Sequence, residues 1–333
     1  MLANGKLRNG VNTAIPCSLK TLYINPSLND LKGSKINGVQ KCVRFHAKQL
    51  SKRTERLRAL NLMEVLKMDS KKQTVGGTGE WAVENFNLIS GCSHGCKYCY
   101  ACAGASRKKQ RIASDWVNER PLKTKKTIKL YPGTLMIPST HDITPQNISV
   151  VLPVIQELLN VGNALLIVSK PHLECVKTMC EQLKEYKNKI LFRFTIGSPN
   201  SEVLKYWEPN APSVEERIEC LELAFNEGYQ TSVSCEPMLD TIDNIKVLIS
   251  RVMPSITNAM WIGKPNKLLG HLKNNGAINN STLTRVRLFR DWYNDFTVNT
   301  LYNEFKDNPK IKWKESIKRV VGLEIPTEKG LDI

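Results

Sequence analysis

FNLISGCSHGCKYCYAC, residues 86–102, places four cysteines directly after a short apolar run. Cys92, Cys96 and Cys99 have the spacing C-x3-C-x2-C, and cysteine thiolates are the usual ligands of iron–sulfur clusters. Three thiolates on one tight loop hold three irons of a [4Fe–4S] cluster and leave the fourth iron open to a small chelating molecule. The sequence therefore predicts Cys92, Cys96 and Cys99 as metal ligands.

Two other interpretations of this stretch remain open. A structural zinc site needs four ligands, and Cys102 or His94 is available as the fourth. Alternatively, the spacing arises by chance among the ten cysteines of the chain. Zinc motifs more often pair two separated C-x2-C units, so we interpret Cys102 as a bystander and His94 as a loop residue. Five scattered cysteines are expected to be small buried hydrophobes: Cys17, Cys42, Cys175, Cys180 and Cys220.

The composition is 41% hydrophobic and 24% charged over 333 residues, which is typical of a globular protein with a full core. No apolar run reaches the roughly 18 residues of a membrane helix. The N-terminus, MLANGKLRNG, lacks the apolar core of a secretory signal. We therefore expect a cytoplasmic protein without membrane contact. The sequence carries no sign of an oligomeric state.

The net charge of +17 is concentrated on both sides of the cysteines. Residues 1–85 carry 15 Lys and Arg against 6 Asp and Glu, and residues 107–129 carry nine against two. Clustered bases of this kind usually indicate a polyanionic partner, so DNA or RNA is the expected partner. The alternative is a solvated basic surface that binds nothing. The candidate contact residues are Lys52, Arg53, Arg56 and Arg58, together with Arg107, Lys108, Lys109 and Arg111.

After the cysteines, apolar runs of strand length alternate with helical segments. Including a first strand over 84–90, the expected strands cover 134–140, 164–170, 190–197, 230–237 and 259–264. This alternation predicts an α/β fold with a parallel sheet, a partial (β/α)6 barrel that is an open version of the eight-stranded barrel. We expect a basic N-terminal extension over 1–80, a core domain over 81–265 and a C-terminal helical segment over 266–333, with helices over 281–306 and 311–320.

Six stretches of the chain resemble the spore photoproduct lyase-like branch of the radical S-adenosylmethionine superfamily. They are GCSHGCKYCYA, IPSTHDITP, LLIVSKP, FRFTIGS, WEPNAPSVEERIECLELAFNEGY and SCEPMLD, in the order seen in that branch. The resemblance implies a [4Fe–4S] cluster whose open iron is chelated by S-adenosylmethionine. It also implies reductive cleavage of that cofactor to a 5′-deoxyadenosyl radical, which abstracts hydrogen from the substrate, and an electron donor such as flavodoxin or ferredoxin.

The resemblance also implies roles for residues outside the cysteine motif. It places His141 and Asp142 near the cofactor, Lys170 in contact with it, and Ser198 as a further polar contact. Tyr98 and Tyr100, on either side of the last cluster cysteine, resemble tyrosines that relay the radical.

The ends of the predicted strands support this placement. Functional residues of α/β barrels gather at the carboxyl ends of the strands. Polar residues occur there on successive strands, and as a set we expect them to face the cofactor: Ser139, Thr140, Lys170, Ser198 and Glu236.

One departure from the family limits the expected activity. The DNA-repairing lyase has a cysteine hydrogen donor in the segment that matches IPSTHD, where this chain has Ser139. A serine O–H bond is too strong for that role, so thymine-dimer repair is not expected. Cys235 is either a thiol donor from another direction or a buried structural cysteine. The leading hypothesis is an enzyme that repairs or modifies a nucleic acid. The alternatives are an enzyme acting on a protein or small metabolite, or a non-catalytic metal-bearing nucleic-acid-binding protein.

Overall fold

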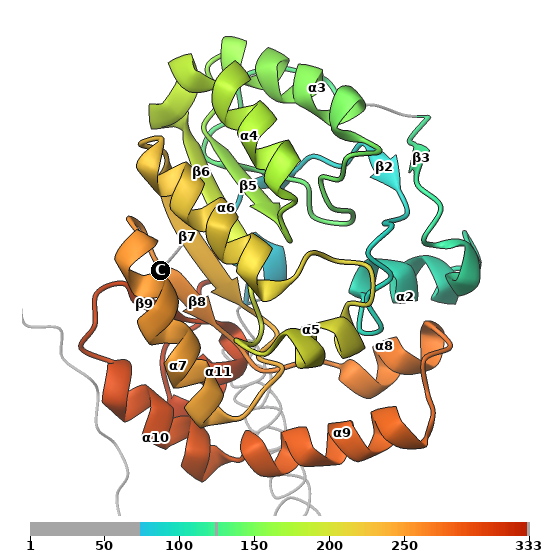
Figure 1. Cartoon of the computed structure of the whole chain (residues 1–333), viewed down its shortest axis with the longest axis vertical. Coiled ribbons are helices and arrows are strands. Elements are labelled where there is room, and N and C mark those ends of the chain that lie inside the picture. Colours follow the sequence, from blue (N-terminus) through green and yellow to red (C-terminus); the bar gives the residue numbers. More distant parts are fainter. Residues whose placement is uncertain (1–73, 124–125, 332–333) are drawn as a thin grey trace, which may run out of the picture. The chain divides into compact units, whose positions relative to one another are not determined.

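The computed structural model describes residues 74–123 and 126–331 (Figure 1). The chain divides into two compact units, Met1–Ser70 and Lys71–Ile333, and every described residue belongs to the second. The expected contact residues before position 70 therefore lie outside the described residues, as do Cys17 and Cys42. Among the described helices, none combines the length and the apolar character of a membrane span.

Seven parallel strands form the main sheet in the order β1-β4-β5-β6-β7-β8-β9. The strands are β1 Glu84–Asn85, β4 Leu135–Ile137, β5 Leu165–Ser169, β6 Ile190–Thr195, β7 Gln230–Cys235, β8 Met260–Ile262 and β9 Ile311–Trp313. β1 and β9 are its edges, so within the described residues the sheet is open rather than closed into a barrel. The predicted α/β class with an open, parallel sheet is confirmed.

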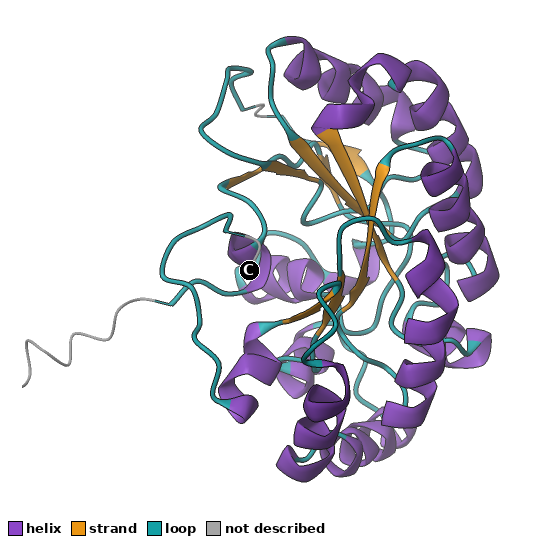
Figure 2. Cartoon of the chain, turned by 90° about the vertical axis from the view of Figure 1, so that its left-hand side faces the viewer, coloured by secondary structure: helices purple, strands orange, loops and turns teal. Residues whose placement is uncertain are grey.

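The connecting helices lie along one side of this sheet (Figure 2). They are α3 Ile148–Asn160, α4 Leu173–Gln182, α5 Ser201–Trp207, α6 Val214–Asn226 and α7 Ile242–Val252. Their apolar side chains form one buried cluster with alternate residues of the strands, for example Val176 of α4 and Leu221 of α6 with Leu165 and Ile167 of β5. Cys175, Cys180 and Cys220 are buried in this cluster, as expected for small hydrophobes.

The opposite face of the sheet holds a smaller apolar cluster. Met136 and Leu166 contribute to it from β4 and β5, together with Trp81 and Trp261. Successive residues of a strand point to opposite faces, which explains why Leu165 belongs to the first cluster and Leu166 to the second.

The first strand differs from the prediction. Instead of one strand over 84–90, the structure has β1 and then β2 Ile89–Ser90, which pairs antiparallel with β3 Arg120–Pro121 in a separate sheet. Asn87 lies between them, and its Oδ1 accepts hydrogen bonds from the backbone N–H groups of Ser139 and Thr140, both at 2.8 Å. The chain therefore leaves the main sheet early because Asn87 holds the loop that follows β4.

The C-terminal segment also differs from the prediction. The helix expected over 281–306 is two helices, α9 Asn280–Trp292 and α10 Asp295–Phe305, because the Asn294 side chain accepts from the Thr297 N–H at 3.1 Å and starts a new helix. The helix expected over 311–320 is the edge strand β9 followed by α11 Glu315–Val321. Ile311 and Trp313 are buried on either side of Lys312, the alternation of a strand. Segment 266–333 thus contributes a strand to the main sheet.

Candidate active site

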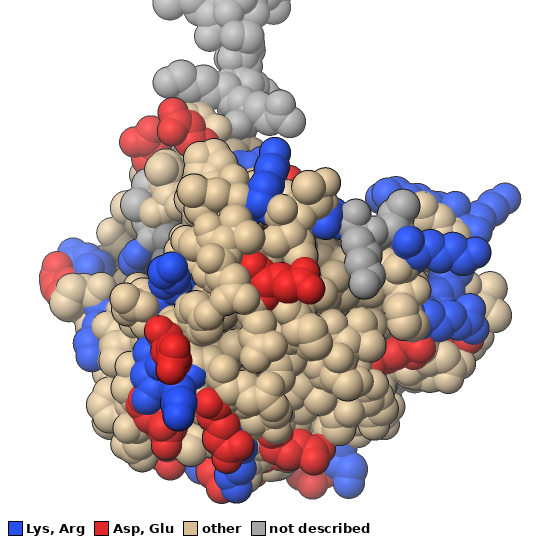
Figure 3. Space-filling model, turned by 90° about the horizontal axis from the view of Figure 1, so that it is seen from above, with Lys and Arg blue, Asp and Glu red and all other residues tan. Residues whose placement is uncertain are grey.

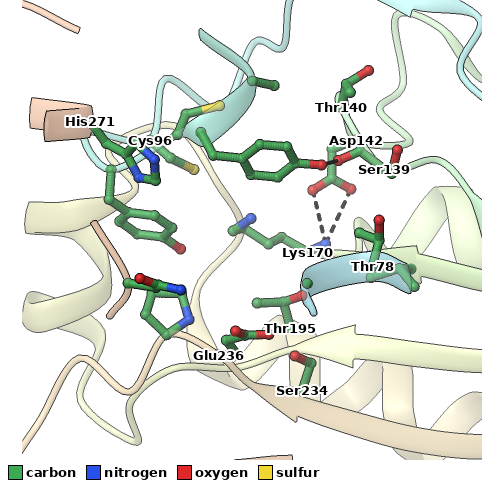
Figure 4. A pocket seen from close by; sticks show the side chains of 18 of the residues that line it. Thr78, Cys96, Ser139, Thr140, Asp142, Lys170, Thr195, Ser234, Glu236 and His271 are labelled. Atoms are coloured by element: carbon green, nitrogen blue, oxygen red, sulfur yellow. Dashed lines mark hydrogen bonds between the residues drawn. The ribbon is translucent and has the colours of Figure 1, made fainter. Parts of the chain in front are cut away.

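A cavity of about 680 Å³ lies at the carboxyl ends of the central strands (Figure 4). Each of β4 to β7 delivers polar residues to its wall: Ser139 and Thr140 after β4, Ser169 and Lys170 from the end of β5, Thr195 of β6, and Ser234 and Glu236 from the end of β7. This volume is within the range of small-molecule and cofactor sites. Four of the five strand-end residues expected to face the cofactor line this cavity: Ser139, Thr140, Lys170 and Glu236.

The cysteine loop forms another part of the wall, with Cys92, Cys96 and Cys99 all lining the cavity. The loop needs glycine at its start, since Gly91 has φ +100° and a Cβ there would lie 2.7 Å from the Trp116 carbonyl oxygen. Its end is joined to α2 Tyr100–Arg107, where the Cys99 Sγ caps the helix by accepting the Cys102 backbone N–H at 3.4 Å.

The environment of the three thiols favours their neutral form. Burial raises the pKa of Cys96 to about 12 and also raises the pKa values of Cys92 and Cys99. Such thiols become stable thiolates only when a bound cation compensates the charge. In residues 74–123 and 126–331, no three His, Cys, Asp or Glu side chains are already gathered as a metal site. The three free thiols fit an iron–sulfur cluster by their chemistry and by the cavity that they share.

Cys102 is placed differently from the other three cysteines. It is buried against Trp116, does not line the cavity, and its Sγ lies 4.0 Å from the Ala113 carbonyl oxygen. This position agrees with the interpretation of Cys102 as a bystander.

His94 has more contacts than expected for a simple loop residue. It is fully buried, its Nδ1 lies 3.3 Å from Asp142 Oδ2, and its Nε2 lies 2.9 Å from His172 Nε2. The side chain thus connects the cysteine loop to the loops that follow β4 and β5.

Asp142 fixes the strand ends around the cavity. Its carboxylate accepts the Lys170 backbone N–H at 3.0 and 3.1 Å, shown as dashed lines in Figure 4, and also the Ser169 hydroxyl. Burial would raise the pKa of Asp142, but His94, Lys170 and the Ser169 hydrogen bond outweigh it and hold the pKa well below its usual range. Asp142 is therefore a buried, ionised anchor in the cavity wall.

His141 is neutral and its two ring nitrogens have assigned roles. Nε2 accepts the Leu88 backbone N–H at 3.1 Å, so Nδ1 carries the proton and donates to the Asp142 carbonyl oxygen at 2.9 Å. Burial lowers the pKa of His141, which keeps this tautomer uncharged. The residue lines the cavity and links the strand before the cysteines to the loop after β4.

Lys170 brings a positive charge into the cavity. Figure 4 shows its side chain extending from the backbone contact with Asp142 toward the side where Cys96 and His271 lie. Burial lowers its pKa, but Cys96, Glu208 and Asp142 outweigh burial and raise it overall. In the described part of the chain the Lys170 ammonium has no ion-pair partner within 4 Å, so its charge is available to a ligand.

Both tyrosines beside Cys99 line the cavity, in different environments. The Tyr98 hydroxyl donates to Glu208, a fully buried carboxylate that pairs with Arg217. The Tyr100 side chain is 50% exposed and its hydroxyl donates to the Ser139 carbonyl oxygen.

Two of the predicted site residues do not reach the cavity. The Ser198 hydroxyl is buried and donates to Asp240 Oδ2 at 2.6 Å. Cys235 is buried in the cluster between sheet and helices, because its neighbours Ser234 and Glu236 point to the opposite face and line the cavity. Both side chains therefore contribute to the protein interior and not to the cavity wall.

Glu236 lines the cavity and belongs to a buried charge cluster. Its Oε2 lies 3.5 Å from the Lys314 ammonium, which also lies 2.8 Å from Glu80 Oε1. Burial raises the pKa of Glu236, and the attraction of Lys314 does not fully offset it.

Segment 266–333 contributes residues to the site that were not predicted from the sequence. The loop before α8 Leu268–Asn274 and α8 itself line the cavity with Lys264, Lys267 and His271. Asn275, which ends α8, donates to the Lys97 and Cys99 carbonyl oxygens, both at 3.0 Å. These contacts join residues more than 170 positions apart, and no local motif marks them.

No protein-family model matches this chain. It is 28% identical over 182 residues to the uncharacterized protein ORF301 of Acidianus two-tailed virus; the match covers 49% of this chain and 59% of the length of that relative.

Two kinds of solved structure are similar to it. One is a cysteine-to-alanine variant of spore photoproduct lyase with dinucleoside spore photoproduct, at 12% identity, with 73% of this chain and 79% of that chain covered and a TM-score of 0.46. The other is Streptococcus suis SuiB bound to S-adenosylmethionine, at 11% identity, with 87% and 66% covered and a TM-score of 0.45.

Proposed function

We propose that the protein is a radical S-adenosylmethionine enzyme whose cysteine loop holds a [4Fe–4S] cluster through Cys92, Cys96 and Cys99. The observation that carries the proposal is that three free thiols line one cavity at the carboxyl ends of parallel strands, together with a lysine that has no ion pair in the part of the chain that the structure describes. A cluster bound there with S-adenosylmethionine supplies reductive cleavage of the cofactor to a 5′-deoxyadenosyl radical.

Different residues of the cavity have different roles in binding S-adenosylmethionine. Lys170 presents a cation to the carboxylate of S-adenosylmethionine, and a hydrogen bond to a charged group contributes about 1.5–3 kcal/mol. Asp142 and His141 position the loops that carry Lys170 and the cysteines. Glu236 presents a carboxyl group to the cofactor from β7. Tyr98 and Tyr100 are the candidates for radical relay, since both line the cavity.

The proposed substrate is a nucleic acid, which the enzyme repairs or modifies in the cytoplasm with electrons from a flavodoxin or ferredoxin. The support is the exposed basic group Arg107, Lys108 and Lys109 at the end of α2, the helix that follows the cluster loop. Arg111, the fourth candidate contact residue of this segment, does not belong to the exposed group. Its guanidinium pairs with Asp115 at 2.9 Å and donates to the Ser90 carbonyl oxygen at 2.6 Å, so it is already bonded within the protein.

Formation of 5′-deoxyadenosine by the reduced, anaerobically reconstituted protein tests this function. We expect the product from S-adenosylmethionine alone, and more of it when single-stranded DNA or RNA is added. Protein treated identically without iron is the control and should form none. Absence of 5′-deoxyadenosine under all these conditions would contradict the proposed chemistry. Stimulation by a peptide or metabolite, and by no nucleic acid, would instead contradict the proposed substrate.

A further inference from the structure

The charges that line the cavity are unevenly compensated. Its carboxylates have partners: Asp142 has His94, Glu236 has Lys314, and Glu315 accepts from Asn266 at 3.1 Å. Its lysines, in contrast, have no ion pair anywhere in the described ranges: Lys170, Lys264 and Lys267. An anionic ligand can therefore pair with these lysines without displacing a carboxylate of the protein.

These cations differ in depth. Lys170 and Lys264 are partly buried in the cavity wall, whereas Lys267 is exposed where the loop after β8 enters α8. The proposed cofactor, S-adenosylmethionine, has one carboxylate. Lys170, which extends toward Cys96, is placed to bind it. The outer cations then remain for the anionic groups of a second ligand.

A strip of basic residues leads from the cavity to the surface near the end of α2: Lys264, Lys267, Arg107, Lys108 and Lys109. Helix α8 packs against α2, and Asn275 at the end of α8 donates to the Cys99 carbonyl oxygen just before α2, so the two helices run antiparallel. Arg107 at the end of α2 and Lys267 just before α8 therefore lie at the same end of this helix pair. Burial lowers the pKa of His271 most, and Lys267 and Arg107 lower it further. Among the described residues neither Arg107 nor Lys267 has an acid partner, so the two cations repel each other, and a bound phosphate would relieve that repulsion.

Beyond Arg107 the strip reaches Lys108 and Lys109, which are exposed and have no ion pair among the described residues. The nearby acid, Asp115, is already paired with Arg111 and Arg120. Figure 3 shows Lys and Arg side chains gathered at the right-hand edge of the molecule, the side on which α2 lies in Figure 1. A row of unpaired cations running into a cavity suits a polyanion, since a single acidic side chain would occupy only one of them.

We propose that Arg107 and Lys267 form a phosphate seat at the mouth of the cavity and guide the sugar–phosphate backbone of a nucleic acid strand from α2 into the cavity. This inference rests on the proposed function and names the residues that would deliver its substrate. Lys264 also lines the cavity and is less exposed than Lys267, so it is placed to bind the next anionic group of the strand.

The test is binding of a fluorescein-labelled oligodeoxythymidylate of twelve nucleotides, followed by fluorescence anisotropy over a series of salt concentrations. The test variant is Arg107→Gln/Lys267→Gln. The control variant, Arg287→Gln/Lys306→Gln, removes the same charge from exposed positions on α9 and after α10. Circular dichroism melting of both variants checks that they are folded.

Loss of two phosphate contacts should flatten the salt slope by about 1.4, because each contact to a single strand contributes about 0.7. With equal affinities at about 1 M salt, this slope difference corresponds to about 25-fold weaker binding by the test variant at about 100 mM salt. The control variant should bind like the wild-type protein.

Equal affinity and equal salt slopes for the two variants would overturn the phosphate seat. Wild-type protein that binds polyglutamate as tightly as the oligonucleotide would overturn it as well, by pointing to an acidic peptide. Formation of 5′-deoxyadenosine by wild-type protein without oligonucleotide is measured in parallel. Failure of that reaction contradicts the proposed function, whereas its success with indistinguishable variants contradicts only the seat.

Discussion

Lys314 offers a quantitative test of how the C-terminal segment supports the cavity. The side chain is 0% exposed, and its ammonium lies 2.8 Å from Glu80 Oε1, 2.8 Å from the Gly77 carbonyl oxygen and 3.5 Å from Glu236 Oε2. It also lies 4.0 Å from the centre of the Trp81 ring. One buried cation therefore joins the residue after β9 to the segment before β1 and to the cavity wall.

Lys314→Met keeps most of the side-chain volume but removes the ammonium that lies 2.8 Å from Glu80 Oε1, a carboxylate that is 1% exposed. In the described residues neither Glu80 carboxylate oxygen has another hydrogen-bond donor. Breaking a buried ion pair by removing one partner costs about 3–5 kcal/mol, a large share of the roughly 5–15 kcal/mol that stabilises a typical domain. Glu80→Gln should cost less, about 1–3 kcal/mol, because Lys314 keeps Glu236 and the Gly77 carbonyl.

Urea denaturation followed by circular dichroism measures these free energies of unfolding. The exposed Lys306→Met is the matched control and should change stability by less than about 0.5 kcal/mol. The double variant Glu80→Gln/Lys314→Met should be more stable than the sum of the single losses predicts, since a neutral amide at position 80 no longer needs the cation that Lys314→Met removes. If Lys314→Met is as stable as Lys306→Met, or if the two losses simply add, the charge cluster does not have the role assigned to it.

Three other results are expected. Lys170→Ala should weaken S-adenosylmethionine binding, measured by calorimetry, by about 1.5–3 kcal/mol; unchanged affinity would remove Lys170 from the cofactor site. Arg111→Ala should lower the melting temperature, whereas Lys109→Ala should not, because Arg111 is bonded inside the fold and Lys109 is exposed. Because the pKa of Glu236 is raised in the folded state, the folded protein keeps a proton that the unfolded chain releases above about pH 4.5. The free energy of unfolding should therefore fall as the pH rises from about 4.5 through the folded-state pKa. Glu236→Gln should flatten that pH dependence, and an unaltered profile would contradict it.

Local patterns in the sequence were sufficient to predict the central sheet. The apolar run over 164–170 contains β5, and the polar residue that ends it, Lys170, was correctly expected at the carboxyl end of a strand. The first strand was predicted too long because its apolar run continues to Ile89. Only tertiary structure shows that Asn87 interrupts the run to bind the backbone after β4.

The site was predictable where residues lie close in sequence or at strand ends. The three-cysteine loop, Asp142 and Lys170 all line the expected cavity. The alternation of β7 could have excluded Cys235, since Ser234 and Glu236 cannot face the cavity unless Cys235 faces away.

Long-range parts of the site could not be predicted from one sequence. Lys314 and Glu80 are separated by more than 230 residues, and neither stands in a recognisable motif. The same holds for α8, whose contact with the cysteine loop depends on how the segment after β8 folds back over the cavity.

The central claim is that the loop from Cys92 to Cys99 holds the cluster, and iron and sulfide content after anaerobic reconstitution tests it most directly. Wild-type protein and Cys102→Ala should each bind about four irons per chain with a brown colour. Cys92→Ala, Cys96→Ala and Cys99→Ala should each lose most of that iron. A full cluster in any of these three variants, its loss from Cys102→Ala, or a colourless wild-type protein that binds zinc instead would contradict the account.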